Sequence, residues 1–316
     1  MKIGKIIPRS VKNLILRIVR IPERIKVKIY RAAANGKIPF PDKAYIKWNY
    51  KIHTGDSLNL KSPSTFQEKL SWMKLHYHIP LHSKMVDKYA VRDIIKEKIG
   101  EEYLVPLLGV YDSFDDINFD SLPNQFVLKC SHDSGSVVIC KDKSIFDFNY
   151  AKKTIVSHMK VNHFYRSREW PYKNVKPRIL CEPYLKDDNA VDRPDYKFLC
   201  FNGEPKIIMV LTDRGSEDTQ KMNYYNMNWE LLPITEKIYP NNPLPDKKPE
   251  CFDQMIEFSK ILSNGIPFVR VDFTSVNGKL YFGELTFYHN GAQRKLFPLE
   301  WNRIMGDWLT LPSKTN

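Results

Sequence analysis

The feature that most constrains the fold is the stretch FVRVDFTSVNGKLYFGELTFYHNG, residues 268–291. It contains two runs of β-branched and aromatic residues around Asn277-Gly278, which is the strongest short-range signal for a β-hairpin. Each run also contains an acid, Asp272 in the first and Glu284 in the second. Because a carboxylate among apolar strand residues is costly without a positive partner, the stretch predicts a hairpin that carries a charged site.

The length of the turn decides whether the two acids can act together, because side chains alternate along a strand. A two-residue turn would place Asp272 and Glu284 on opposite faces, whereas a three-residue turn with Gly278 left-handed would place them on one face, about 5.5 to 8 Å apart. We therefore predict an odd-length turn. Two such carboxylates can hold Mg²⁺ beside phosphate oxygens, and Arg270 would share their face. The alternative is a pair of surface carboxylates with a nearby arginine.

A second site is predicted around Lys129, which ends the strand-like run 126–128 and lies just before the small polar loop 132–136. A lysine held by a strand beside such a loop suits phosphate, because the ammonium is a point charge and loop amides can surround terminal phosphates. The Gly-x-x-x-x-Gly-Lys spacing of a Walker loop is absent. The alternative is an ordinary hairpin with a surface lysine.

The rest of the chain mixes helical and strand-like segments, which predicts an α+β protein built in lobes. Residues 31–60 and 214–248 have no pattern that predicts regular structure. Helices are expected from Phe66 onward, with Thr65 and Glu68 as a capping box, at about 87–98 and at about 253–262; strands are expected at 125–130, 137–140, 177–185 and 195–211, the last with a turn at Asn202-Gly203.

Composition narrows the partners and the compartment. No apolar run of about 18 residues appears, so no membrane span is expected. The five cysteines, Cys130, Cys140, Cys181, Cys200 and Cys251, form no close pairs, which favours reduced, buried thiols in the cytosol over a zinc site. Nucleic-acid-binding signatures are absent, so nucleic acid is not an expected partner.

The net charge of +13 is concentrated at the start of the chain, where residues 1–30 contain nine Lys or Arg and one acid. On a helical wheel, residues 10–21 place apolar side chains on one arc and Arg17 and Arg20 opposite, and Pro22 ends the helix. Such a basic amphipathic helix suits an anionic inner-membrane surface. The alternative is a helix docked on the body of the protein with a solvated basic face.

Five phrases in sequence order, TFQEKLSWMKL, DKYAVR, DYKFLCFNGEPK, VRVDF and ELTFYHNG, resemble the TupA-like branch of the ATP-grasp superfamily over about residues 60–310. The resemblance implies an α+β ATP-grasp fold in which two α+β subdomains hold ATP between them, preceded by a helical N-terminal region. The implied organisation is a basic N-terminal region at 1–60, an N-terminal lobe at 61–122, a small ATP-grasp subdomain at 123–186 and a large one with the magnesium site at 187–316.

The resemblance also implies roles for the residues at the matching motif positions. Thr286 stands where many members have Asn, so its hydroxyl, Asn290 or water would complete the shell of one or two Mg²⁺ ions. The implied catalytic residues are Arg270, Lys129 and Lys197; the implied ATP-binding residues are Lys129, Ser134, Gly135, Ser136, Glu182, Leu185 and Asp195; the implied metal ligands are Asp272, Glu284 and Thr286.

The implied reaction is the joining of a carboxylate to an amine through an acyl phosphate, with release of ADP. For the TupA-like branch, the expected substrates are a carboxylate-bearing saccharide of a cell-surface polysaccharide (capsular, teichuronic or O-antigen) and an amine such as an amino acid. Residues 30–120 and 214–248 are expected to select them. The resulting picture is a cytoplasmic enzyme, peripheral at the inner membrane.

Two other functions remain open at this point. A glycosyltransferase of polysaccharide synthesis would find acids for a metal in KDDN, Lys186 to Asn189, although no nucleotide-sugar βαβ unit with its glycine turn is present. The other is a saccharide-binding scaffold that keeps the ATP-grasp fold without catalysis. Release of ADP, of UDP or of neither would distinguish the three.

Overall fold

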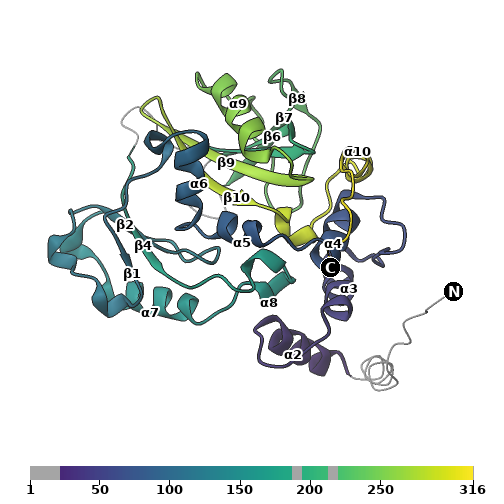
Figure 1. Cartoon of the computed structure of the whole chain (residues 1–316), viewed down its shortest axis with the longest axis horizontal. Coiled ribbons are helices and arrows are strands. Elements are labelled where there is room, and N and C mark those ends of the chain that lie inside the picture. Colours follow the sequence, from purple (N-terminus) through teal and green to yellow (C-terminus); the bar gives the residue numbers. More distant parts are fainter. Residues whose placement is uncertain (1–21, 187–193, 213–219, 316) are drawn as a thin grey trace.

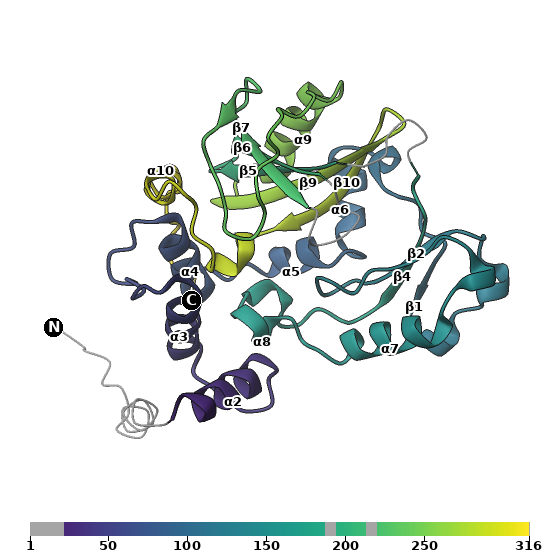
Figure 2. The ribbon, with the colours of Figure 1, turned by 180° about the vertical axis from the view of Figure 1, so that it is seen from behind.

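The computed structural model describes residues 22–186, 194–212 and 220–315. The amphipathic helix predicted at 10–21 and the acids of the KDDN stretch lie outside these described residues. Two antiparallel sheets dominate the described part, and they lie side by side with helices around them (Figure 1). The view from behind shows the first helices gathered at one end, beyond the larger sheet (Figure 2). None of the described helices is both long and apolar enough to cross a membrane.

The larger sheet has the strand order β10-β9-β5-β6-β7-β8. Helix α9 packs on β5, β6 and β9, and side chains from α4 (Phe66–His76), α5 (Pro80–Val86) and α6 (Val91–Lys98) join the same hydrophobic core. The strands are β5 (Asp195–Phe201), β6 (Glu204–Thr212), β7 (Lys221–Tyr225), β8 (Leu231–Leu232), β9 (Phe268–Val276) and β10 (Lys279–Thr286), and α9 spans Phe252–Ser263. The predicted strands, the Asn202-Gly203 turn and this helix are confirmed, whereas β7 and β8 lie in a segment where no regular structure was expected.

The smaller sheet has the order β1-β4-β2-β3 and carries its own core, which helix α7 covers. Its strands are β1 (Gly109–Tyr111), β2 (Phe126–Cys130), β3 (Val138–Cys140) and β4 (Ile179–Pro183), and α7 spans Phe148–Met159. All five cysteines are free, and all except the half-buried Cys251 are buried, which confirms the expectation that these thiols pack in the interior.

The N-terminal third is helical, so the prediction of a loop at 31–60 is wrong. Helix α3 buries Tyr45, Ile46 and Tyr50, and this burial outweighs the modest helix propensity of aromatic and β-branched residues. The remaining helices are α2 (Glu23–Ala34), α3 (Asp42–Thr54), α4 (Phe66–His76), α5 (Pro80–Val86), α6 (Val91–Lys98), α8 (Phe164–Ser167) and α10 (Glu300–Trp308); short 3-10 turns are η1 (Glu101–Tyr103), η2 (Phe114–Asp116), η3 (Phe119–Ser121), η4 (Lys143–Ile145), η5 (Trp170–Tyr172) and η6 (His289–Ala292).

Two predicted helix starts have different outcomes. The capping box is confirmed, because the Thr65 hydroxyl accepts from the backbone N–H of Glu68 while the Glu68 carboxylate accepts from that of Thr65. The helix expected from residue 87 begins only at Val91. The Asp87 carboxylate instead accepts from the N–H of Tyr89 and holds a separate turn between α5 and α6.

The hairpin predicted around Asn277-Gly278 forms, but the predicted turn length is wrong. Asn277 and Gly278 make a two-residue turn, with φ values of 50° and 75°, between Val276 and Lys279. A β-bulge between Phe282 and Glu284 then inserts Gly283 as an extra residue, so Glu284 pairs directly with Asp272. The bulge shifts the register by one residue and places both acids on one face, as the odd-length turn would have done.

Gly283 lies close to the opposite backbone, and this close approach favours glycine at the bulge. Gly283→Ala should lower the free energy of unfolding by about 1 to 3 kcal/mol, because the added Cβ would lie 3.1 Å from the backbone oxygen of Asp272. Urea unfolding measures the change. Lys279→Ala, at an exposed position of the same strand, is the control and should shift it by less than about 0.5 kcal/mol. An unchanged midpoint for Gly283→Ala would contradict the close approach.

Candidate functional site

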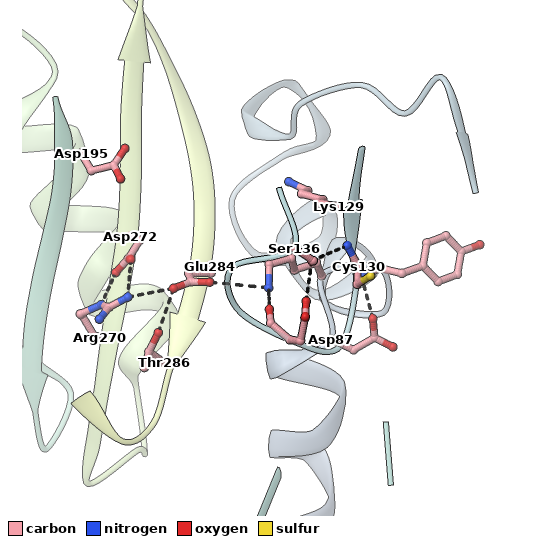
Figure 3. A network of polar contacts seen from close by, with 12 residues as sticks. Asp87, Lys129, Cys130, Ser136, Asp195, Arg270, Asp272, Glu284 and Thr286 are labelled. Carbon is pink, nitrogen blue, oxygen red and sulfur yellow. Dashed lines mark hydrogen bonds and ion pairs between the residues drawn. The ribbon is translucent and has the colours of Figure 1, made fainter. Parts of the chain in front are cut away.

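A buried charge cluster lies on β9 and β10 of the larger sheet. The Arg270 guanidinium donates to both oxygens of Asp272 at 2.6 Å and to Glu284 Oε1 at 2.8 Å. Lys197, which pairs with Asp272 in the register of β5 and β9, donates to Asp272 Oδ2 at 2.6 Å. Figure 3 shows these acids and Arg270 together, with Glu284 pointing away from the sheet toward the smaller one. The structure thus brings together predicted residues of the neighbouring strands β5, β9 and β10.

The environment keeps both acids ionised. Asp272 is 4% exposed and Arg270 8%, whereas the Glu284 side chain remains 34% exposed. Burial acts to raise the pKa of Asp272, but Arg270 and Lys197 outweigh it, so the pKa lies below its usual value. Burial likewise opposes ionisation of Glu284, and the pKa of Glu284 is lowered by Lys88 and Arg270.

The donor set of this cluster fits a magnesium ion. Two ionised carboxylates face one side of the hairpin, and the Thr286 hydroxyl lies 3.3 Å from Glu284 Oε1, so hard oxygen atoms are grouped as Mg²⁺ requires. Both oxygens of Asp272 are already bound by cations, whereas the closest cation to Glu284 Oε2 is Lys88 at 3.8 Å. Asn290 instead turns its amide toward Glu236, at 3.1 Å.

The smaller sheet presents a second set of predicted residues. Lys129 on β2 forms an ion pair of 2.7 Å with Glu182 on the neighbouring β4. Leu185 follows β4 directly before the connection to the larger sheet. Asp195 begins β5 on the other side of that connection, with its carboxylate 3.7 Å from Lys197. Leu185 and Asp195 therefore lie where the chain passes from one sheet to the other, and Glu182 lies just before this passage and pairs with Lys129.

The polar loop after Lys129 is only partly open. The Ser136 hydroxyl donates to Asp133 Oδ1 at 2.6 Å and accepts from the Cys130 N–H at 2.8 Å, so this buried serine closes the loop on itself. Asp133 also contacts the His158 ring. Ser134 and Gly135 are exposed, and Gly135 has a φ of 95°, which favours glycine. Of the three predicted loop residues, these two face solvent.

Lys88 joins the two halves, and sequence reasoning missed it. Its ammonium donates to the backbone oxygen of Asp133 at 2.5 Å and lies 3.8 Å from Glu284 Oε2. The contact therefore links the polar loop of the smaller sheet to the charge cluster of the larger one. The phrase DKYAVR contains Lys88, but its role depends on the turn between α5 and α6, which the local pattern did not reveal.

A second missed group lies behind Arg270. The His289 Nδ1 atom is 3.4 Å from the Nη1 atom of the Arg270 guanidinium, and His289 Nε2 is 3.8 Å from Glu236 Oε1. The buried Glu236 carboxylate also accepts from the Tyr224 hydroxyl at 2.7 Å and from Arg294 at 3.4 Å. Burial is the main cause that lowers the pKa of His289. The ring is therefore neutral and can accept a hydrogen bond from Arg270. This network fixes the rear of the guanidinium.

Comparison with known proteins places these features in a family. The model of the TupA-like ATP-grasp family matches residues 68–310. The D-alanine–D-alanine ligase of Bacillus anthracis complexed with ATP is similar at 17% identity and a TM-score of 0.37, over 64% of this chain and 55% of that one. The D-alanine–D-alanine ligase of Helicobacter pylori is similar at 14% identity and a TM-score of 0.37, over 72% and 61%.

A further similar structure is the ATP-grasp ligase PsnB complexed with a phosphomimetic variant of minimal precursor, Mg and ADP, at 11% identity and a TM-score of 0.41, over 77% of this chain and 64% of that one. The aligned parts span 55% to 64% of the length of these three chains. No curated protein matches the sequence.

Acid should destabilise the protein through Asp272. A carboxyl group whose pKa is depressed on folding stabilises the folded state above its unfolded pKa, about 4, and loses that contribution as the pH falls through the folded value. Asp272→Asn should therefore flatten the decline of the urea midpoint between about pH 5 and 2. Asp253→Asn, whose side chain is 92% exposed, should keep the wild-type dependence. Parallel curves for Asp272→Asn and wild type would exclude this contribution.

Proposed function

The chain belongs to the TupA-like ATP-grasp family and has the ATP-grasp fold, and on that premise we propose that it is an ATP-dependent ligase that joins a carboxylate to an amine through an acyl phosphate. The observation that carries the proposal is the contact across the two sheets, where Lys88 lies between Glu284 of the larger sheet and the loop at Asp133 of the smaller one. Family membership favours the ligase over the glycosyltransferase.

The proposed roles follow the position of each side chain. Lys129 of the smaller sheet, Lys197 of the larger sheet and Lys88 between α5 and α6 bring cations to the two sides of the site. The residues proposed to bind ATP are Lys129, Ser134, Gly135, Ser136, Glu182, Leu185 and Asp195; those proposed to hold one or two Mg²⁺ ions are Asp272, Glu284 and Thr286; those proposed to act in catalysis are Arg270, Lys129 and Lys197. Because Ser136 closes the loop, its contribution would be to shape the loop.

The proposed reaction needs positioning and charge neutralisation rather than a protein nucleophile. A substrate carboxylate oxygen attacks the γ-phosphorus, the bond to ADP breaks, and Arg270 and Lys197 stabilise the charge on the transferred group. The amine loses a proton to water, its nitrogen lone pair attacks the acyl carbon, the bond to inorganic phosphate breaks, and the remaining extra N–H proton leaves with the phosphate or water as the amide forms. Bound magnesium would neutralise phosphate oxygens during the transfer.

The proposed setting is cell-surface polysaccharide synthesis, with a carboxylate-bearing saccharide and an amine such as an amino acid as substrates. The family suggests this setting, and the basic start of the chain supports work at the inner face of a membrane. On helix α2, Arg24, Lys28 and Arg31 are exposed beside the exposed Ile25 and Val27. Exposed cations that alternate with apolar side chains suit an anionic lipid surface.

Removal of the Lys129 charge should weaken ATP binding. Lys129→Met keeps the length of the stem and should lower ATP affinity by about tenfold or more, because a charge-assisted phosphate contact is lost. Isothermal titration with ATP and Mg²⁺ measures the change. Lys141→Met, an exposed lysine that directly follows β3, should bind ATP as the wild type does. Equal affinities for the two variants would remove Lys129 from the nucleotide site.

The reaction class is tested by trapping. With ATP, Mg²⁺, pooled uronic acids and hydroxylamine, the enzyme should form a hydroxamate and an equal amount of ADP, because a small strong amine can replace the natural amine substrate. Glu284→Gln should slow trapping by about two orders of magnitude, since the loss of preorganised charge costs on the order of 3 kcal/mol. Glu250→Gln, exposed and remote, is the control. Release of AMP would show adenylation and refute the acyl phosphate.

A further inference from the structure

The connection between α7 and β4 is held firmly beside the charge cluster. Lys74 of α4 donates to the backbone oxygen of Ser167 at 2.9 Å and to that of Gly291 at 2.6 Å. Gly291 belongs to η6, in which His289 approaches Arg270. A Cβ added at Gly291 would lie 3.4 Å from Ser167 Cβ, so the two segments are in contact. One buried lysine thus ties residues 163–172 to the loop behind Arg270.

The other side of this connection is anchored on helix α3. Arg168 is 1% exposed, forms an ion pair of 2.8 Å with Asp42 and lies with its guanidinium 4.1 Å from the Tyr45 ring centroid. The Tyr45 hydroxyl donates to the backbone oxygen of Arg166 at 2.9 Å. Arg168 has a φ of 59°, a conformation that is strained for a non-glycine residue and is commonly kept at functional sites.

Three polar side chains of this anchored connection have acceptors without a partner among the described residues. Glu169 is 6% exposed, and the only hydrogen bond of its carboxylate within the described chain is from the Ser167 hydroxyl to Oε1, at 2.6 Å. Glu169 forms no ion pair within the described ranges 22–186, 194–212 and 220–315. The Tyr172 hydroxyl and the His163 ring likewise bond to no described group, and their rings meet edge to face at 4.7 Å.

Glu169 and Tyr172 lie on one tight turn, in which the Tyr172 N–H donates to the backbone oxygen of Glu169 at 3.2 Å. Two residues earlier, Ser167 is held by Lys74 against the loop behind Arg270. Burial, and then the carboxylates of Glu169 and Glu284, raise the pKa of Tyr172 well above its usual value, so the hydroxyl stays neutral. Burial also lowers the pKa of His163, while Glu169 acts in the opposite direction. A neutral imidazole keeps one lone pair free. A carboxylate, a hydroxyl and an imidazole therefore offer acceptors beside the reaction space.

We propose that Glu169, Tyr172 and His163 bind the protonated amine of the second substrate, a primary ammonium group. The inference rests on the proposed ligase function and adds the place and charge of the amine. An ammonium has three N–H donors, which match these three acceptors, and it brings the positive charge that a buried carboxylate without an ion pair lacks. In the proposed complex, the cations of the cluster face the phosphates and the substrate carboxylate, whereas Glu169 supplies the negative charge for the ammonium group.

A structural explanation for Glu169 is that it balances the charge of Lys74. The Lys74 ammonium is already bound by two backbone oxygens and forms no ion pair with Glu169. Burial lowers the pKa of Lys74 to about 8, and Glu169 only partly offsets this. The two explanations differ in what Glu169→Gln should change, because a distant counter-ion affects stability but not recognition of an amine.

The test measures binding of amines by thermal shift and by isothermal titration in the presence of Mg²⁺ and AMPPNP. The probes are glycine, L-lysine, ethanolamine and glucosamine, each paired with its N-acetylated, uncharged form. At least one amine should stabilise the wild type while its acetylated form does not. Glu169→Gln should raise the dissociation constant of that amine by about tenfold or more and leave the AMPPNP shift unchanged.

Controls keep each outcome decisive. Tyr172→Phe should weaken amine binding severalfold, and it decides the question if circular dichroism shows Glu169→Gln to be unfolded. Glu250→Gln, an exposed position, should bind the amine as the wild type does. The inference is overturned if no amine stabilises the wild type in the presence of AMPPNP, or if folded Glu169→Gln and Tyr172→Phe bind it unchanged. Absence of any AMPPNP shift in the wild type would instead refute the ATP-dependent function.

Discussion

The pairing of Arg270 with Asp272 and Glu284 is the interaction on which the site depends. Two carboxylates directly opposite each other on neighbouring strands repel, and burial increases the cost of their charges. The guanidinium bridges both with planar, well-directed donors, which a lysine could not do from one position. The bulge at Gly283 and the neighbouring Lys197 complete the arrangement, so strand register and charge balance support each other.

This cluster lies on β9 and on the edge strand β10 of the larger sheet. Within the described residues, few contacts connect it to the smaller sheet. Lys88 provides the bridge, with one contact to a carboxylate and another to the backbone of the polar loop. Such a bridge is electrostatic and partly exposed, so it joins the two sheets without belonging to either core. In the proposed complex, Lys88 would be a cation available to a polyphosphate between two separately packed units.

Short-range sequence signals predicted those features that depend mainly on residues adjacent in sequence. The Asn277-Gly278 turn, the capping box at Thr65 and the strands around Lys129 follow from short-range preferences, and the order of motifs identified the family. The bulge at Gly283 did not follow, because a one-residue insertion leaves no mark except a glycine whose need depends on the opposite backbone. Helix α3 and strand β7 were missed because tertiary burial, not periodicity, stabilises them. The mostly exposed helix α2 and strand β8 were missed as well.

The residues that sequence reasoning did not find share one physical cause, since each acts through a neighbour distant in sequence. In η6, Asn290, Gly291 and Ala292 all have left-handed φ values between 50° and 60°, a run that is unfavourable for the two non-glycine residues. Lys74 holds this loop from the N-terminal helices, and Glu236 holds it from the segment after β8. The contacts of Lys74 and Glu236 hold this strained loop from two sides and fix the position of His289 beside Arg270. The N-terminal helices therefore make the site more rigid, although they supply none of its charged groups.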